Sequence, residues 1–554
     1  MTHHSSVRSM AQLATGIGHT DCRRRAFASL LGVMLLSPWM DSNASQLQVS
    51  DVPSEIRQMI VAAGGSKWDA VTTLTGVGEK TSFGLTGKFH MQVSLVTGSY
   101  EAGADYGSFA NADGVDQAGR WRQDNSGQVH PLDSPEGQAV AVSESYLARH
   151  GYFFPQRLPA NFRLVGPITE GATRYVRIEV MPEHGRALVL WSNATSHLLD
   201  RAVLELSVGV ETVRYGDYRP VEGLMLPFQI SVERRDENET GTAVIGNYQI
   251  STTAPAADLL RPAAVVSDIA MSAGAKAAKA RGYFDRDSGF FIVMASINGK
   301  GPYSFILDTG GHNILTPRMV QQLGLTTQGK GFTTGAGTGS ATTEFTNVSS
   351  VAIGSAVLSA QPFVILHLDL GTTQDGKRQQ PIAGILGLEV LERFAVTMDF
   401  KDQTVTLHPL SQFTYAGAGL RVSLRFTNDM PLVQATLDGH PGWFGVDTGN
   451  NTNLIVFQHW AESNGLAPVY RNAMKTEGSS VGGSVDLRTA RAKSFQIGGK
   501  ELGSIGILMA SGDAGSLSAR FEAGNFGNSI LSHFTVTFDY HSEAMYLEPL
   551  SETQ

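Results

Sequence analysis

The chain has 554 residues, of which 42% are hydrophobic and 17% charged, and its formal net charge is −9. This composition supplies enough apolar side chains for folded cores and excludes a disordered or nucleic-acid-coating chain. At roughly 100 to 200 residues per domain, the length predicts about three or four domains. Glycine is abundant, with 61 residues that fall mostly between short apolar runs. This pattern favours β-rich domains.

The first 44 residues are typical of an export signal. Arg23 to Arg25 precede a nearly uncharged run from Ala26 to Met40, and small residues follow at Ser42 to Ala44. The run is shorter than the ~20 residues of a transmembrane helix. We therefore expect a signal peptide at 1–44 and a periplasmic or secreted protein without a transmembrane span in its mature part. The arginines fit both the general and the twin-arginine export routes.

The only cysteine, Cys22, lies inside this predicted signal. The exported part is therefore expected to have no thiol for catalysis, for disulfides or for metal binding.

The segment 45–252 alternates short apolar runs with Gly, Asn and Asp turns. After a helical pattern from Val52 to Gly65, the alternation predicts an antiparallel sheet with one solvated face. The runs that show it most clearly are Lys88–Leu95, Tyr175–Val180, Arg201–Leu206 and Leu226–Glu233. Residues 253–281, which are rich in alanine and include two prolines, are predicted to be a linker that is helical in part.

Beyond the linker the sequence repeats itself at a nearly constant offset. Asp308 and Asp447 are 139 residues apart, and Phe394 and Phe534 are 140 apart. Each copy has an apolar strand pattern, an Asp-Thr-Gly tripeptide, a glycine-rich stretch and a closing pair of strands. The repeat predicts two lobes. Their expected bounds are residues 282–412 and 413–554.

The repeated tripeptide is the strongest chemical signal in the chain. Either copy alone could be an ordinary Asx turn. Two carboxylates that meet from two lobes can share one proton, so that one acid polarises a carbonyl while the other takes a proton from water. Asp308 and Asp447 are therefore the candidate catalytic residues, and we treat them as one titrating unit. The candidate supports, through hydrogen bonds across the lobe interface and room for N–H groups, are Thr309, Gly310, Thr448 and Gly449.

These motifs resemble those of the aspartic peptidases, in particular a bacterial single-chain version of the retropepsin-like group, over about Tyr283 to Leu550. The resemblance implies two pseudo-symmetric acid-protease β lobes, hydrolysis of peptide bonds by water, and no cofactor or metal. It also implies an apolar-apolar-Gly turn beneath each catalytic loop. Ile385-Leu386-Gly387 fits this turn, while Asn525-Phe526-Gly527 has Asn in the first apolar place. The residues after the motifs, Gly311-His312 and Asn450-Asn451, also differ from the small pair that is common there.

The same resemblance implies hairpin flaps over the cleft, and the matching stretches are 331–340 and 478–484. Glycine at this density permits the backbone motion of a lid, and its N–H groups can bind an extended peptide. The alternative is a pair of plain flexible loops. Neither stretch contains Tyr, so two glycine flaps are favoured over a single flap with Tyr at its tip. The candidate flap residues are Gly335, Ala336, Gly337, Gly339, Gly482 and Gly483.

Other patterns carry less information. The glycine patterns at 335–339 and 371–377 lack the residues or flanking strands of nucleotide-binding loops, and no His-Glu-x-x-His pattern occurs. His312, four residues after Asp308, could touch a substrate but is interpreted as a solvated loop histidine.

The segment 45–252 resembles the antiparallel half-barrel of outer-membrane lipoprotein-sorting and carrier proteins. The resemblance rests on groupings such as Gly64-Gly65-x-x-Trp68, Trp121–Asp124 and Leu190-Trp191. It implies a concave face that accommodates an acyl chain or lipid-like ligand. The same aromatic residues could equally fill the core of a sheet.

Taken together, the sequence predicts a mainly β protein, with two pseudo-symmetric lobes preceded by an antiparallel half-barrel-like α+β domain. The predicted function is an exported aspartic endopeptidase that acts on a peptide or protein substrate and has no nucleic-acid partner. The alternative is a periplasmic lipid- or lipoprotein-binding carrier whose peptidase-like lobes are a non-catalytic scaffold.

Overall fold

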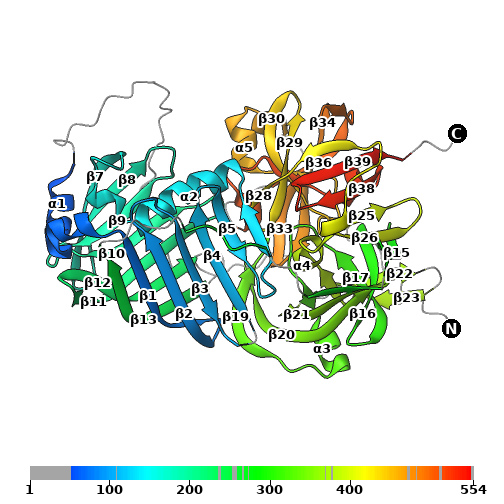
Figure 1. Cartoon of the computed structure of the whole chain (residues 1–554). Coiled ribbons are helices and arrows are strands. Elements are labelled where there is room, and N and C mark those ends of the chain that lie inside the picture. The colour runs from blue at the N-terminus through cyan, green and yellow to red at the C-terminus, as the bar shows by residue number, and fades with distance from the viewer. Residues whose placement is uncertain are drawn as a thin grey trace, which may run out of the picture. The chain divides into compact units, whose positions relative to one another are not determined.

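The computed structural model describes residues 52–550 except 108, 235–238, 253–258, 265–267, 273, 338, 368–369, 376–377, 471–473, 482 and 511–514. The predicted signal peptide, Cys22 and Gly482 lie outside the described residues. Within them, the strands form sheets of 13, 14 and 10 strands and one separate hairpin (Figure 1). The prediction of a mainly β fold is confirmed.

The 13-stranded sheet belongs to the N-terminal sheet region, a name used here for residues 52–251. Two antiparallel meanders, β1–β6 and β7–β13, form it and join where β1 pairs with β13. The four predicted runs fall in β2, β8, β10 and β12, so their prediction as strands is confirmed. The strands are β1 (Thr73–Ser82), β2 (Leu85–Ser94), β3 (Tyr100–Asp105), β4 (Ala110–Asp116), β5 (Gly119–Gln123), β6 (Val129–Leu132), β7 (Ala160–Glu170), β8 (Thr173–Pro182), β9 (Leu188–Asn193), β10 (Leu199–Glu205), β11 (Val210–Val221), β12 (Leu224–Arg234) and β13 (Glu239–Ser251).

Helices pack against this sheet and complete its core. The helix predicted near the start is present as α1 (Ser54–Ala63), and it ends at Gly64, whose φ of 128° suits glycine. Helix α2 (Pro135–Ala148) begins at a cap in which the Ser134 side chain accepts a bond from the Gly137 N–H at 2.9 Å. The short 3-10 helices are η2 (Gly65–Ala70) and η3 (Gly151–Phe153).

The aromatic residues of this region are mostly core residues. Trp68 and Trp121 are 2% and 1% exposed. Ile56 and Met59 of α1 lie in one buried cluster with strand residues such as Ile178. The aromatic groupings of the sequence therefore serve largely to fill the space between helices and sheet.

The first lobe, residues 278–409, is built mainly on the 14-stranded sheet. It contains β15 (Ala278–Asp285), β16 (Phe290–Ile297), β17 (Lys300–Leu307), β18 (Ile314–Leu315), α3 (Pro317–Leu323), β19 (Gln328–Thr334), β20 (Ser340–Ile353), β21 (Ala356–Leu366), the hairpin β22 (Thr372–Asp375) and β23 (Arg378–Pro381), β24 (Gly384–Leu386), α4 (Leu388–Leu391), β25 (Phe394–Asp399) and β26 (Thr404–Pro409). The short η4 (Leu410–Gln412) follows.

The second lobe, residues 420–549, repeats this plan around the 10-stranded sheet. It contains β27 (Leu420–Ser423), β28 (Arg425–Thr427), β29 (Met430–Leu437), β30 (His440–Val446), β31 (Leu454–Val456), α5 (Gln458–Ser463), α6 (Ala467–Tyr470), β32 (Met474–Ser480), β33 (Gly483–Ala492), β34 (Phe495–Ile497), β35 (Lys500–Glu501), β36 (Ile505–Ala510), η5 (Ser516–Ser518), β37 (Gly524–Phe526), α7 (Asn528–Leu531), β38 (Phe534–Asp539) and β39 (Ala544–Pro549).

The closing strands of the two lobes pair with each other. Strands β25 and β38 are antiparallel neighbours, and their equivalent residues Thr397 and Thr537 face each other. The hydroxyl oxygens of these threonines are 2.9 Å apart. The 14-stranded sheet therefore extends from the first lobe into the second, and the two copies of the repeat are related across this pair.

One expectation for the linker is wrong. Over its described part, the segment predicted to be helical in part contains strands. Strand β14 (Ile269–Met271) pairs with β21, and β15 begins at Ala278 and pairs with β16 and β26. The edges of the lobe sheet supply backbone hydrogen-bond partners, and this tertiary pairing outweighs the helix propensity that alanine gives the segment.

The N-terminal sheet region contacts both lobes through ion pairs and backbone bonds. Arg393, whose side chain is 1% exposed, lies 2.8 Å from Asp124 of the sheet region and 2.7 Å from Asp268 of the linker. The Ser134 N–H donates to the Phe426 carbonyl at 3.0 Å. Arg393 thus joins three parts of the chain.

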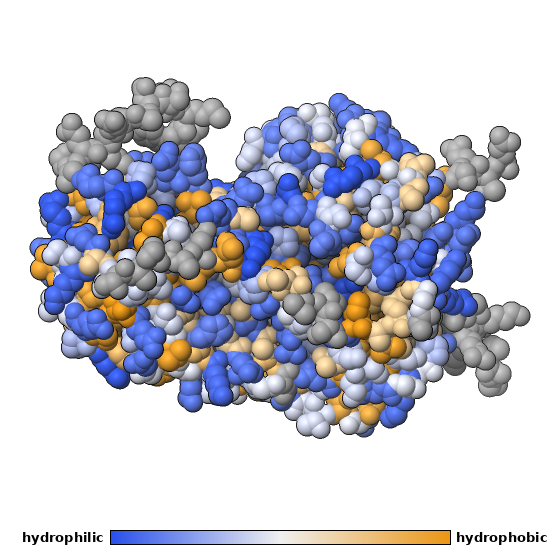
Figure 2. Space-filling view, in the orientation of Figure 1, coloured by the Kyte–Doolittle hydropathy of each residue, from blue (hydrophilic) through white to orange (hydrophobic). Residues whose placement is uncertain are grey.

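On the face shown in Figure 2, hydrophilic residues cover most of the surface, with hydrophobic ones scattered between them. In the described residues, no helix is long and apolar enough to span a membrane.

We expect Arg393→Met to lower the free energy of unfolding by about 3 kcal/mol or more, because it leaves two carboxylates without their buried partner. Urea denaturation measures the change. As a control, Arg163→Met removes a pair with Glu179 whose side chains are 53% and 30% exposed, and it should cost at most about 1 kcal/mol. Equal losses in the two variants would contradict the assignment.

Candidate functional site

Both Asp-Thr-Gly motifs stand at the end of a buried strand. Strand β17 leads into Asp308 and β30 leads into Asp447. Each strand pairs in parallel with a short strand of its own lobe, β24 or β37. The Asp308 N–H donates to the Leu386 carbonyl at 2.9 Å, and the Asp447 N–H donates to the Phe526 carbonyl at 3.0 Å. The two loops are therefore held in the same way.

A glycine follows each short strand because the catalytic loop passes directly above it. A Cβ atom at Gly387 would lie 2.0 Å from the Gly311 carbonyl oxygen, and one at Gly527 would lie 1.9 Å from the Asn450 carbonyl oxygen. No side chain fits at such distances. This close approach explains why both turns end in glycine, as predicted from the resemblance.

The two threonines of the motifs bind each loop to the opposite lobe. The Thr309 hydroxyl donates to the Val446 carbonyl at 2.6 Å, and the Thr448 hydroxyl donates to the Leu307 carbonyl at 2.7 Å. Each hydroxyl also accepts the backbone N–H of the other threonine at 2.9 Å. Both residues are fully buried. We call this reciprocal set of bonds the threonine clamp.

Residues that the sequence analysis did not single out fix the clamp from behind. The Tyr540 hydroxyl donates to the Thr309 carbonyl at 2.9 Å, and the Asn528 side chain donates to the Thr448 carbonyl at 2.7 Å. Both lie near the closing strand β38, far along the chain from the motifs they contact. No local pattern marks them, since their role depends on tertiary contact alone.

The clamp brings the Asp308 carboxylate against the loop of the second lobe. A Cβ atom at Gly449 would lie 2.5 Å from Asp308 Oδ2. Within its own loop, Asp308 Oδ1 accepts the Gly310 N–H at 2.9 Å. Asp447 Oδ1 accepts the Asn450 N–H at 3.0 Å. The structure thus places the two candidate carboxylates, and the four residues expected to support them, in one site.

Burial and mutual repulsion shift the ionisation of this pair. Burial, together with the negative charge of Asp308, raises the pKa of Asp447 to about 8. Burial also raises the pKa of Asp308, although the N–H groups of Gly310 and Gly449 and the nearby His312 act against it. Two neighbouring carboxyl groups do not both ionise readily, because their negative charges repel each other. The Asp308–Asp447 pair therefore retains one proton into neutral pH.

Asn525, the departure from the apolar turn, contacts the pair directly. Its side-chain N–H donates to Asp447 Oδ2 at 3.0 Å. The orientation of its amide follows from a chain of bonds: the Thr452 N–H donates to Asn450 Oδ1, and Asn450 Nδ2 donates to Asn525 Oδ1 at 2.8 Å. Asn525 therefore presents a donor to Asp447, whereas its counterpart in the first lobe, Ile385, has none to offer.

The structure corrects the interpretation of His312. Both of its ring nitrogens contact carboxylates: Nδ1 lies 2.8 Å from Glu389 Oε1, and Nε2 lies 3.0 Å from Asp429 Oδ2. The side chain is 42% exposed, so it is solvated as predicted, but the prediction missed the two carboxylates that pair with it. The signal that sequence reasoning lacked was the position of the two acids, which lie 77 and 117 residues further along the chain.

The predicted flap stretches are the tips of two hairpins, β19–β20 and β32–β33, and the tips touch. The Ala336 N–H donates to the Ser480 hydroxyl at 3.0 Å, and the Gly337 N–H donates to the Val481 carbonyl at 3.0 Å. Gly335 and Gly337 therefore lie in this contact, Gly339 is exposed beside it, and Gly483 begins β33.

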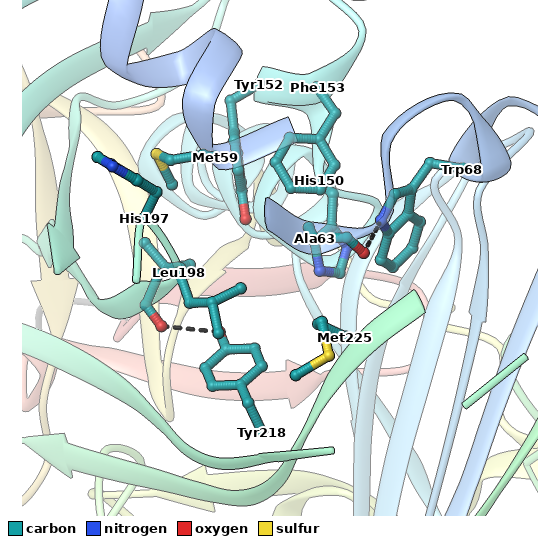
Figure 3. Close-up of a pocket in the computed structure, with 11 residues that line it drawn as sticks. Met59, Ala63, Trp68, His150, Tyr152, Phe153, His197, Leu198, Tyr218 and Met225 are labelled. Atoms are coloured by element: carbon teal, nitrogen blue, oxygen red, sulfur yellow. Dashed lines mark hydrogen bonds between the residues drawn. The ribbon is translucent and has the colours of Figure 1, made fainter. Parts of the chain in front are cut away.

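A separate pocket lies in the N-terminal sheet region, between its helices and sheet (Figure 3). Its free volume is only about 20 Å³, which is room for about one water molecule. Aromatic and sulfur-containing side chains dominate its wall. The lining includes Met59, Trp68, Tyr152, Phe153, Tyr218 and Met225.

Groups of three or more His, Asp or Glu side chains arranged as metal ligands do not occur in the described part of the chain.

Two segments, residues 293–390 and 433–523, match the profile of a protein family described as Aspartyl protease, and they include Asp308 and Asp447. No curated protein matches the chain.

Solved structures match the chain in two places. A retropepsin-like aspartic protease from Rickettsia conorii matches at 19% identity, covering 24% of this chain and 89% of that one, with a TM-score of 0.19. A putative outer membrane lipoprotein-sorting protein domain from Vibrio parahaemolyticus matches at 8% identity, with coverage of 36% and 92% and a TM-score of 0.27. A LolA superfamily protein from Nitrosomonas europaea matches at 13% identity, with coverage of 35% and 93% and a TM-score of 0.25.

We expect Thr309→Val to lower the free energy of unfolding by about 2 to 6 kcal/mol, because it leaves the buried Thr448 N–H and Val446 carbonyl without partners, at about 1–3 kcal/mol each. Urea denaturation measures the loss. Thr397→Val is the matched control, since it removes one hydroxyl contact between the same lobes, and it should cost about 1 kcal/mol. A loss at Thr309 no larger than at Thr397 would argue against the clamp.

We expect Asn525→Leu to raise the pKa of Asp447 above its value of about 8, because the variant removes a hydrogen bond that favours the ionised carboxylate. Carboxyl ¹³C NMR titration of labelled aspartates reads this change. A pKa that stays the same or falls would show that the amide does not stabilise the charged form.

Proposed function

Because residues 293–390 and 433–523 form an aspartyl protease domain, we propose that the chain is an aspartic endopeptidase with Asp308 and Asp447 as its catalytic pair. The observation that carries the proposal is the threonine clamp, which holds the two Asp-Thr-Gly loops face to face. Thr309, Gly310, Thr448 and Gly449 act as supports of the catalytic loops.

The chemistry follows from a pair that holds one proton. The ionised carboxylate accepts a proton from a water molecule, and the water oxygen attacks the scissile carbonyl carbon. The protonated acid donates its proton to the carbonyl oxygen, which gives a tetrahedral diol. Collapse of the diol breaks the C–N bond: the carboxyl that took the proton from water passes it to the leaving nitrogen, and a diol hydroxyl returns its proton to the other carboxylate, which restores the pair with one proton. No cofactor takes part in the proposed steps.

The pKa of about 8 at Asp447 sets the expected pH range of activity. Below that pH the pair keeps one proton. Above it this remaining proton is lost, and activity should decline. On the acid side, activity falls as both carboxyls become protonated. The proposal therefore includes cleavage at neutral pH as well as in mild acid.

The two hairpin tips supply the cover of the cleft in this proposal. Their contacts through Ala336 and Gly337 must open to admit a chain. Their N–H groups can then bond an extended peptide as an added strand. We infer Gly335, Gly339 and Gly483 as parts of the same moving segments.

We infer export to the periplasm or outside the cell from the signal-like residues 1–44, and we propose the bounds 45–252, 253–281, 282–412 and 413–554 for the parts that follow. A carrier with a non-catalytic scaffold remains the second candidate. The pocket lined by Trp68 gives it little support, since its free volume of about 20 Å³ is room for about one water molecule. Purified protein that carries lipid and cleaves no peptide at any pH would support the carrier instead.

We expect Asp308→Asn and Asp447→Asn each to reduce kcat/KM on a peptide library by about 10²-fold to 10⁴-fold, because each removes an acid or base from the reaction. A statine-type inhibitor should block the wild-type chain. Asp399→Asn is the matched control: Asp399 is also a repeated aspartate, but its carboxylate caps a turn through the Lys401 and Asp402 N–H groups. Full cleavage by both catalytic-site variants would end the proposal.

A further inference from the structure

His312 is placed to act on the catalytic pair through its charge. It lies in the loop that begins at Asp308, and the loop is fixed on α4, since the Asn313 N–H donates to Glu389 Oε2 at 2.8 Å. The other oxygen of Glu389, Oε1, lies 2.8 Å from His312 Nδ1, and Asp429 Oδ2 lies 3.0 Å from His312 Nε2. Each ring nitrogen of His312 is therefore paired with a carboxylate oxygen.

This geometry fixes the protonation state of the ring. A neutral imidazole has one N–H donor and one lone pair, and the lone pair would then face a carboxylate. With a carboxylate at each nitrogen, the doubly protonated imidazolium is the form that fits. Burial opposes the charge, but Asp429 and Glu389 outweigh it and raise the pKa of His312 well above its usual value.

Asp429 is in turn anchored by the N-terminal sheet region. It stands in the turn between β28 and β29, where Arg122 of β5 pairs with it through Nη1. Arg122 Nη2 also lies 3.6 Å from Glu392, and His130 of β6 lies 3.0 Å from the same carboxylate. Burial works against the charge of Asp429, but Arg122 and His312 hold its pKa well below the usual range.

The corresponding loop of the second lobe, Asp447 to Asn453, contains no cationic residue. The residue equivalent to His312, at the same offset of 139, is Asn451, and its amide donates to the Ser288 carbonyl at 3.0 Å. Only the Asp308 side of the pair therefore has a positive charge in its own loop, among the described residues. The titratable and charged side chains around that cation are those of Asp308, Glu389, Asp429, Arg122, Glu392 and His130.

We propose that His312 is a positioning residue that makes Asp308 the carboxylate to ionise first, and that Arg122 of the N-terminal sheet region completes the site by holding Asp429 against it. The inference rests on the proposed peptidase function. On this account the first region of the chain is a structural component of the catalytic site and not only a neighbour.

The test of His312 is the pH dependence of kcat/KM. Removing the cation in His312→Gln makes ionisation of Asp308 less favourable, so the acid limb should move to higher pH by about one unit. His312→Arg keeps a cation that can pair with both carboxylates, and it should restore the wild-type limb. A His312→Gln profile that superimposes on the wild type, or an arginine variant that behaves like glutamine, would overturn the proposal.

The test of Arg122 is a double-mutant cycle. Arg122→Met removes positive charge from the cluster and frees Asp429, so it should move the acid limb in the same direction, and its effect should shrink when His312 is already Gln. Arg425→Met is the matched control, because it breaks pairs with Asp133 and Glu543 at the same contact without touching Asp429. Equal shifts in Arg122→Met and Arg425→Met would overturn the anchoring role.

Histidine ¹³C NMR separates this proposal from the proposed function. If the wild-type chain cleaves no peptide, the peptidase function fails, and the NMR titration still decides the charge. His312, assigned by loss of its signal in His312→Gln, should stay an imidazolium well above neutral pH and should titrate lower in Asp429→Asn. A His312 signal that titrates at the usual value in the wild type would refute the proposal even in an active enzyme.

Discussion

The site depends on the threonine clamp. Two hydroxyl groups and two backbone N–H groups close a ring of buried hydrogen bonds across the lobe interface, with distances of 2.6–2.9 Å. Each loop reaches its position only because the other lobe supplies a carbonyl and an N–H group for it. The carboxylates of Asp308 and Asp447 are carried on these loops, so their separation and their shared ionisation follow from the clamp. The paired strands β25 and β38 repeat the same symmetry at the base of the lobes.

The pair sits in surroundings that are not symmetric, although the fold around it nearly is. On one side an imidazolium held by Glu389 stands in the Asp308 loop. On the other side the Asn525 amide donates to Asp447. Both features arise at positions where the chain departs from its own repeat. The Asp-Thr-Gly motifs are identical in the two lobes, and only the residues around them differ. The two lobes can therefore keep the catalytic pair while the neighbouring residues change the ionisation of each carboxyl group.

Much of this arrangement was predictable from the sequence, for identifiable reasons. The repeat offset and the Asp-Thr-Gly motifs located the two loops, and alternation located the strands of the first sheet. Helix α2 was not predicted, although Ser134 and Pro135 give it a normal cap and first turn, because its apolar residues show little helical periodicity. The linker was predicted from its composition alone. Its described strands, however, form because strands far along the chain supply backbone hydrogen-bond partners. The surroundings of His312 could not be predicted either, because Asp429 meets His312, and Arg122 meets Asp429, only in the folded chain.

Neutron diffraction from crystals grown near neutral pH tests the central claim most directly, because it locates the protons on the two aspartates. The account predicts a single deuteron held between the Asp308 and Asp447 carboxyl groups, with His312 deuterated at both ring nitrogens. Two bare carboxylates, or carboxyl groups that face separate solvent regions, would contradict it.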